Sequence, residues 1–146
     1  MKYTSGNTGR VFVARFDHNE KFLTSLEELV KKENIRAGVI HLLGAIDEGD
    51  VVTGPKEHKI PTDSKWIHLD EVHELIGLGS IYWEDENPII HIHSSIGCEN
   101  QTKVGCLRKN ASVFIVIEAV IFEIVNCNVV RTFDPATGYA LVDPQE

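Results

Sequence analysis

The sequence has little of the basic charge that a nucleic-acid-binding protein needs. Its 146 residues include 14 lysines and arginines against 22 aspartates and glutamates, a formal net charge of −8. The only adjacent basic pairs are Lys31-Lys32 and Arg108-Lys109. Because proteins that grip the phosphate backbone carry a basic stripe or patch, we expect no general nucleic-acid binding.

The sequence also has no long apolar run, and its first residues do not predict a secretory leader. The nearest approach to the ~18 apolar residues of a membrane span is the stretch 111–125, which Glu118 and Glu123 interrupt. The first ten residues contain no apolar region of the signal-peptide kind. The three cysteines are an odd number, so they cannot all pair within the chain. We expect a cytoplasmic protein without a membrane partner, its thiols free or metal-bound.

The patterns that are present predict one α+β domain over residues 1–146. Residues 20–34 follow a helical period, with Asn19 as the expected N-cap and Asn34 as the C-terminal stop. The other segments are strands joined by turns too short for parallel crossovers, which favours a largely antiparallel sheet of about seven strands. The predicted strands are 9–16, 37–46, a short piece at 51–53, 66–70, 71–83, the stretch around His91 and His93, 112–125, and part of 126–133. We expect turns at 47–50, 84–88 and 134–138, a loop at 54–63, and a tail from 139 onward.

The longest apolar strand, residues 112–125, is apolar on both faces. Its β-branched content favours a strand over a helix. We expect the helix to cover one face and another subunit the other. Glu118 lies inside this run, where a carboxylate needs either a structural partner or a functional role.

The best chemical signal is the stretch from Pro88 to Arg108. His91 and His93 are two apart, so on a strand they point to the same face. Cys106 follows thirteen residues after His93, a distance at which a hairpin returns it to the imidazoles. Two imidazoles and a thiolate are a ligand set for Zn²⁺, or for another divalent metal, with a fourth position left for water or a substrate.

Each of these residues also has an ordinary structural interpretation. A His-x-His pair is frequent on solvated strands, and Cys106 between apolar neighbours resembles a small buried hydrophobic residue. Cys98 is an alternative thiol, although it lies only five residues past His93. His41 is interpreted as a core or interface histidine, with a role near the metal as the alternative. His73 is expected on a surface strand.

The order of these segments resembles the PPC domain ("plants and prokaryotes conserved") in its stand-alone prokaryotic form. The resemblance covers residues 9 to about 140. It implies a mainly antiparallel sheet with a packed helix, assembled as a homotrimer. Plant members carry AT-hooks centred on Arg-Gly-Arg-Pro, which this sequence lacks, so their DNA binding is not carried over. The residues that carry the resemblance are 9–16, 40–46, 73–80, 91–93, 104–107, Glu118 and 134–138.

The resemblance also bears on the third metal ligand. Many prokaryotic members have His-x-His followed by Gly-Gly-His-Leu, and the corresponding stretch here is Val104-Gly-Cys-Leu107. A loop one residue shorter places Cys106 at the histidine position, whereas a gap-free alignment places Leu107 there. We prefer Cys106, because that alignment exchanges one zinc ligand for another.

The leading hypothesis is therefore a homotrimeric, metal-binding protein of unassigned activity that takes a small ligand at the metal. One alternative is a DNA-associated regulator like the plant relatives. The other is a metal-dependent hydrolase with Glu74 or Glu118 as base or supporting partner. In a trimer, Arg108 is a candidate supporting group from a neighbouring subunit.

Overall fold

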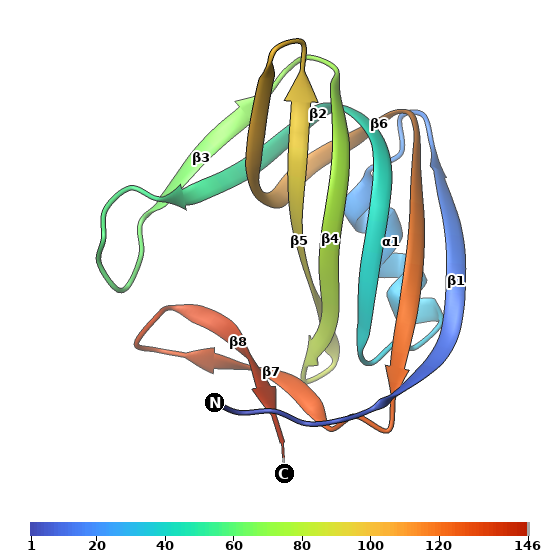
Figure 1. Cartoon of the computed structure of the whole chain (residues 1–146), viewed down its shortest axis with the longest axis vertical. Coiled ribbons are helices and arrows are strands. Elements are labelled where there is room, and N and C mark those ends of the chain that lie inside the picture. The colour runs from blue at the N-terminus through green and yellow to red at the C-terminus, as the bar shows by residue number, and fades with distance from the viewer. Residues whose placement is uncertain (146) are drawn as a thin grey trace.

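The computed structural model describes residues 1–145, which form eight strands and one helix. All the paired strands are antiparallel, which confirms the predicted α+β fold (Figure 1). Among these residues, no helix has the length and apolar character needed to cross a membrane. The elements are β1 (Asn7–Asp17), α1 (Phe22–Lys32), β2 (Gly38–Pro55), β3 (Ser64–Leu69), β4 (His73–Glu84), β5 (Asn87–Cys98), β6 (Gln101–Val125), β7 (Val129–Asp134) and β8 (Tyr139–Pro144).

The six-stranded main sheet closes on itself. Its strand order is β1-β6-β5-β4-β2-β3, and β6 pairs with β2 in addition. The pairs β2–β4, β4–β5, β5–β6 and β6–β2 therefore form a closed circuit, to which β1 and β3 add further strands. One cluster of buried apolar side chains joins this sheet to α1, so sheet and helix share a core.

The helix is held by one apolar stripe. Phe22, Leu26 and Val30 recur every four residues and are 0% exposed, and burying such a side chain contributes about 1.5–3 kcal/mol. The predicted N-cap at Asn19 is wrong. This residue has a φ of 70° and its N–H donates to the carbonyl of Val113 at 2.9 Å, so it belongs to the turn before the helix. Asn34, with a φ of 50°, follows the helix as expected.

Strand β2 continues through residues 47–50, where the sequence predicts a turn. The register against β6 shifts between Ile46 and Glu48 and again between Glu48 and Asp50, so bulges accommodate the polar residues. Asp50 also accepts hydrogen bonds from His68 Nδ1 at 2.8 Å and Asn110 Nδ2 at 2.7 Å. On its two edges this stretch pairs with β6 at Glu48 and Asp50 and with β3 at Gly49 and Asp50, so neither the turn nor a separate strand at 51–53 forms.

Strand β6 is 25 residues long and changes partners along its length. Its first part pairs with β5 and its last part with β1, while β2 follows its other edge. Asn110 and Ile115, with φ values of 55° and 61°, mark irregular positions between the two parts. The apolar run at residues 112–125 is therefore only the second half of β6, the part that contains its pairing with β1.

Residues 139–144, part of the predicted tail, form strand β8. β7 and β8 make a separate two-stranded sheet with Arg131 opposite Val142. Arg131 is 9% exposed and reaches Ser80 of β4, its Nη2 donating to Ser80 Oγ at 3.4 Å. The hairpin therefore lies at one end of the main sheet, next to β4 (Figure 1).

Candidate metal centre

His91 and His93 project from the same side of β5. The intervening Ile92 is 1% exposed in the core, so the two histidines point away from it. Their ring centroids are 4.9 Å apart and their planes meet at 84°. His91 is half-buried and His93 is exposed, which leaves ring nitrogens available at the surface of the sheet.

The β5–β6 hairpin brings Cys106 to these histidines. In its register, His93 pairs with Cys106 and Ile92 pairs with Leu107. Directly paired residues of antiparallel strands point to the same side, so Cys106 lies with the imidazoles, and Leu107 lies in the core with Ile92. One ligand atom from each of His91, His93 and Cys106 lies within 4.8 Å of the other two. We call these three residues the ligand triad.

The glycine before Cys106 is required by a close approach of β6 to β2. A Cβ on Gly105 would lie 2.6 Å from both the Val51 Cγ1 and the Val52 carbonyl oxygen. A side chain at this position would push the two strands apart. Gly105 therefore sets how deeply Cys106 sits, and Cys106 is only 4% exposed.

Burial shifts the pKa values of His91 and Cys106 in the metal-free protein. It is the main reason that the pKa of His91 is lowered to about 4, with His93, Arg131 and Arg108 acting in the same direction. Burial also raises the pKa of the Cys106 thiol, against the opposing effect of the two arginines. The His91 imidazole is thus neutral at pH 7, while the thiol has to release its proton to bind a metal.

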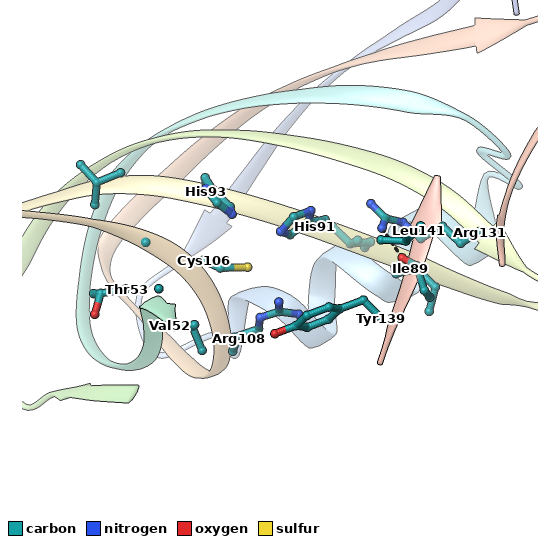
Figure 2. Close-up of a pocket in the computed structure, with 15 residues that line it drawn as sticks. Val52, Thr53, Ile89, His91, His93, Cys106, Arg108, Arg131, Tyr139 and Leu141 are labelled. Atoms are coloured by element: carbon teal, nitrogen blue, oxygen red, sulfur yellow. Dashed lines mark hydrogen bonds between the residues drawn. The ribbon is translucent and has the colours of Figure 1, made fainter. Parts of the chain in front are cut away.

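A pocket opens beside the triad (Figure 2). Its volume is about 480 Å³, and its walls come from β2, β5, β6, β7 and β8. Figure 2 shows the Cys106 sulfur and the His91 ring facing a space whose other side carries Arg108 and Tyr139. Arg131 completes the lining, and no aspartate or glutamate of the described residues contributes to it.

The sequence did not identify the residues that β7 and β8 supply. Arg131, Tyr139 and Leu141 line the pocket, and two of them come from the stretch interpreted as a tail. The available signal was the turn at residues 134–138 between two short alternating stretches, which is a hairpin pattern. That pattern predicts a hairpin, but not its position against β5.

The sequence offers four candidates for groups that support the metal ligands: Glu74, Glu118, Arg108 and His41. Only Arg108 lines the pocket. Glu118, expected inside an apolar strand, is exposed and lies opposite Arg15 of β1. It shares a separate hollow with His41, whose ring packs edge-on against Phe122 at 5.6 Å. Glu74 is exposed on β4. Within one chain, neither carboxylate contributes to the pocket beside the triad.

A second group of possible ligands lies at the β5–β6 turn. Ligand atoms of Glu71, His73 and Cys98 are within 4.8 Å of one another. The expectation of a surface histidine at position 73 is wrong, because His73 is 4% exposed and its Nδ1 donates to the carbonyl oxygen of Glu71 at 2.7 Å. Its pocket is small, about 130 Å³. Cys98 therefore belongs to a different cluster from the triad.

Residues 3–125 match the family model described as the Plants and Prokaryotes Conserved (PCC) domain. A plant- and prokaryote-conserved (PPC) protein from Pyrococcus horikoshii is 25% identical, with a TM-score of 0.86 over 100% of this chain and 99% of its own. A metal-containing protein from Archaeoglobus fulgidus is 24% identical, with a TM-score of 0.84 over 97% of this chain and 98% of its own. A protein from Ralstonia eutropha, named for a supposed DNA-binding role, is 18% identical, with a TM-score of 0.76 over 91% of this chain and 90% of its own. No curated protein matches the sequence.

Proposed function

Since the chain belongs to the Plants and Prokaryotes Conserved domain family, we propose that it binds a divalent metal, zinc in the first place, through His91, His93 and Cys106. The observation that carries the proposal is the β5–β6 register, which gathers three ligand atoms within 4.8 Å at the wall of a pocket. Two imidazoles and one thiolate match the ligand preferences of zinc. The similar protein from Archaeoglobus fulgidus is described as metal-containing, which supports the same assignment here.

The metal site is of the open kind, and a small molecule is its expected partner. Three protein ligands leave a fourth position of a tetrahedral ion free, as in catalytic zinc sites. The pocket of about 480 Å³ adjoins the triad and is within the usual size range for small ligands. A bound ion would supply a Lewis acid at the pocket wall, and the chain's own side chains would position the ligand against it.

A homotrimer is the proposed assembly. The outer face of β1, β2 and β4 exposes large apolar side chains, with Val13 at 84%, Ile76 at 72% and Leu43 at 55%. A contiguous exposed apolar surface of this kind marks an interaction site. A second subunit on this face would also bury Glu118 and His41, which line the hollow there.

DNA binding and hydrolysis receive less support. Some similar structures are named for supposed DNA binding, but this chain has a formal net charge of −8 and lacks the Arg-Gly-Arg-Pro motif. A clear mobility shift of duplex DNA at low salt would support DNA binding. Hydrolysis needs a general base near the metal, and no carboxylate among residues 1–145 lines the pocket.

The deciding experiment measures metal content and assembly together. Untagged protein is analysed by elemental mass spectrometry beside its native mass, and we expect about one zinc per chain in a trimer. His91→Ala should lose most of this metal, whereas His58→Ala, in the exposed loop between β2 and β3, should keep it. Equal metal content in the two variants, or none in the wild type, would reject the proposed site.

A further inference from the structure

Two arginines face the pocket beside the triad without an acidic partner. Arg108 and Arg131 both line it, and neither takes part in an ion pair within residues 1–145. No aspartate or glutamate of this part of the chain lines the pocket either. The pocket therefore concentrates positive charge in a protein whose formal net charge is −8.

Arg131 is the more unusual of the two arginines, because its charged side chain belongs to a residue that is only 9% exposed. Its Nη1 donates to the carbonyl oxygen of Ala140 at 2.7 Å, and its Nη2 donates to Ser80 Oγ at 3.4 Å. Its Nε is buried without a hydrogen-bond partner, and its cation lies 5.9 Å from the ring centre of Tyr82. All of these partners are neutral. A buried guanidinium normally has a carboxylate beside it, since burial of an unpaired charge is costly.

The charge of Arg108 also acts on Arg131. Burial is the main cause that lowers the pKa of Arg131, and the charge of Arg108 lowers it further. Arg108 and Arg131 likewise both act on Cys106 and His91 of the triad, so the four groups share one electrostatic environment. An anion in the pocket would relieve the repulsion and form charge-assisted hydrogen bonds with planar guanidinium groups.

The rest of the lining is mostly apolar. Val52 of β2, Ile89 of β5, Val104 of β6 and Leu141 of β8 surround the space. Tyr139 adds an aromatic ring to the lining, and its hydroxyl hydrogen-bonds to Thr62, which helps to fix the ring. A pocket of about 480 Å³ with such walls suits an organic molecule with an apolar body better than an inorganic ion.

We infer that this pocket binds a small organic oxyanion, a carboxylate or a phosphate ester, through Arg108 and Arg131, with the apolar body of the ligand against Val52, Val104 and Leu141. The inference adds a ligand class to the metal site proposed above. Its arginine contacts do not require the metal, so the two proposals can fail separately. A bound metal would add a further attraction for the same charged end of the ligand.

The test compares three probes of similar size by isothermal titration calorimetry. Benzoate and phenyl phosphate carry the two kinds of oxyanion, and benzamide is the neutral isostere of benzoate. Each is titrated into chelator-treated protein and into zinc-loaded protein. We expect at least one anion to bind about tenfold or more tightly than benzamide, as a hydrogen-bonded charge implies. Whichever of benzoate and phenyl phosphate binds with the higher affinity identifies the class of oxyanion.

Arginine variants assign the binding to the pocket. Arg108→Gln and Arg131→Gln should each weaken anion binding by about tenfold and leave benzamide unaffected. Arg36→Gln is the matched control, because Arg36 stacks on Trp83 at 4.1 Å and does not line the pocket. Arg108 is exposed, so its substitution keeps the test valid if loss of the buried Arg131 prevents folding.

The outcomes separate this inference from the metal proposal. Binding of neither anion, equal binding of benzamide and the anions, or unchanged affinity in Arg108→Gln would overturn the inference, even with one zinc per chain. Arginine-dependent anion binding to a protein that never takes up metal would support the inference and reject the metal site.

Discussion

His93 and Cys106 stand directly opposite each other on β5 and β6, and this one pairing adds a thiol to a pair of imidazoles. A shift of one residue would exchange Cys106 for Leu107 and turn the thiol into the core. The Cys98–Gln101 pairing at the end of the hairpin continues the same register. The composition of the proposed metal site therefore depends on the length of the turn at Glu99 and Asn100.

The first prediction concerns the thiol ligand. Cobalt(II) in place of zinc should give a sulfur-to-metal charge-transfer absorption, because Cys106 is within ligand distance of the two histidines. Cys106→Ser should remove this band and Cys98→Ser should retain it. Retention of the band in Cys106→Ser and its loss in Cys98→Ser would move the site to Glu71, His73 and Cys98.

The second prediction concerns the close contact at Gly105. Gly105→Ala places a methyl group 2.6 Å from the Val52 carbonyl oxygen, so we expect a loss of about 1–3 kcal/mol in the free energy of unfolding. Because the strain lies beside Cys106, metal affinity should fall as well. Gly97→Ala is the control, since its nearest atoms are 3.8 Å away. Urea unfolding of the metal-free proteins measures the difference; equal stability of the two variants would contradict it.

The third prediction concerns the ion pair between the half-exposed Arg10 of β1 and the buried Glu123 of β6. Glu123 is 8% exposed and accepts hydrogen bonds from Arg10 Nε and Nη2, each at 2.8 Å. These bonds hold the pKa of Glu123 below its ordinary value of 4.5. The pair stabilises the fold fully above pH 4.5, and this contribution is lost as the pH falls through the lower folded-state pKa.

Glu123→Gln should therefore lower the free energy of unfolding by about 1–3 kcal/mol at pH 7, and the gap from the wild type should shrink below pH 4. Glu27→Gln breaks only an exposed pair with Lys31 and should cost about 0.3–0.5 kcal/mol. Urea titrations at pH 7 and pH 3.5 give both values. A gap for Glu123→Gln that is equal at the two pH values would disprove the assigned linkage.

The fourth prediction concerns the outer apolar face. Ile76→Glu puts a charge on a side chain that is 72% exposed in the single chain, so the fold should persist while the proposed trimer should dissociate. Ile60→Glu is the matched control, with 69% exposure in the loop between β2 and β3. Native mass spectrometry measures the assembly. Intact trimers in Ile76→Glu would exclude this face as the interface.

Local patterns in the sequence were enough for much of the fold. The stripe of Phe22, Leu26 and Val30 predicts the helix, and alternation along residues 9–16 predicts β1. The proximity of Cys106 to His93 also follows from local information, because a single hairpin joins them. These features depend on contacts close in the chain, where periodicity and turn chemistry apply.

Features that depend on distant contacts could not be predicted in this way. Asp47 and Asp50 are typical of a turn, yet β2 passes through them because β6 pairs with Asp50 on one edge and β3 pairs with it on the other. Arg131 reaches the pocket only because β7 packs near β4, and no local pattern encodes that position. Glu118 lies between apolar neighbours in the sequence, yet it is exposed and lines a hollow that contains no residue of the triad.

The hairpin of β7 and β8 has its own hydrogen-bonded sheet, separate from the circuit that carries the triad. A unit attached in this way can open locally at a lower free-energy cost than unfolding of the main sheet. The hairpin supplies Arg131, Tyr139 and Leu141 to the pocket wall, so such an opening would widen the pocket, and a ligand in contact with both sheets would oppose it. The rate at which such a ligand leaves would then depend on how often this one hairpin opens.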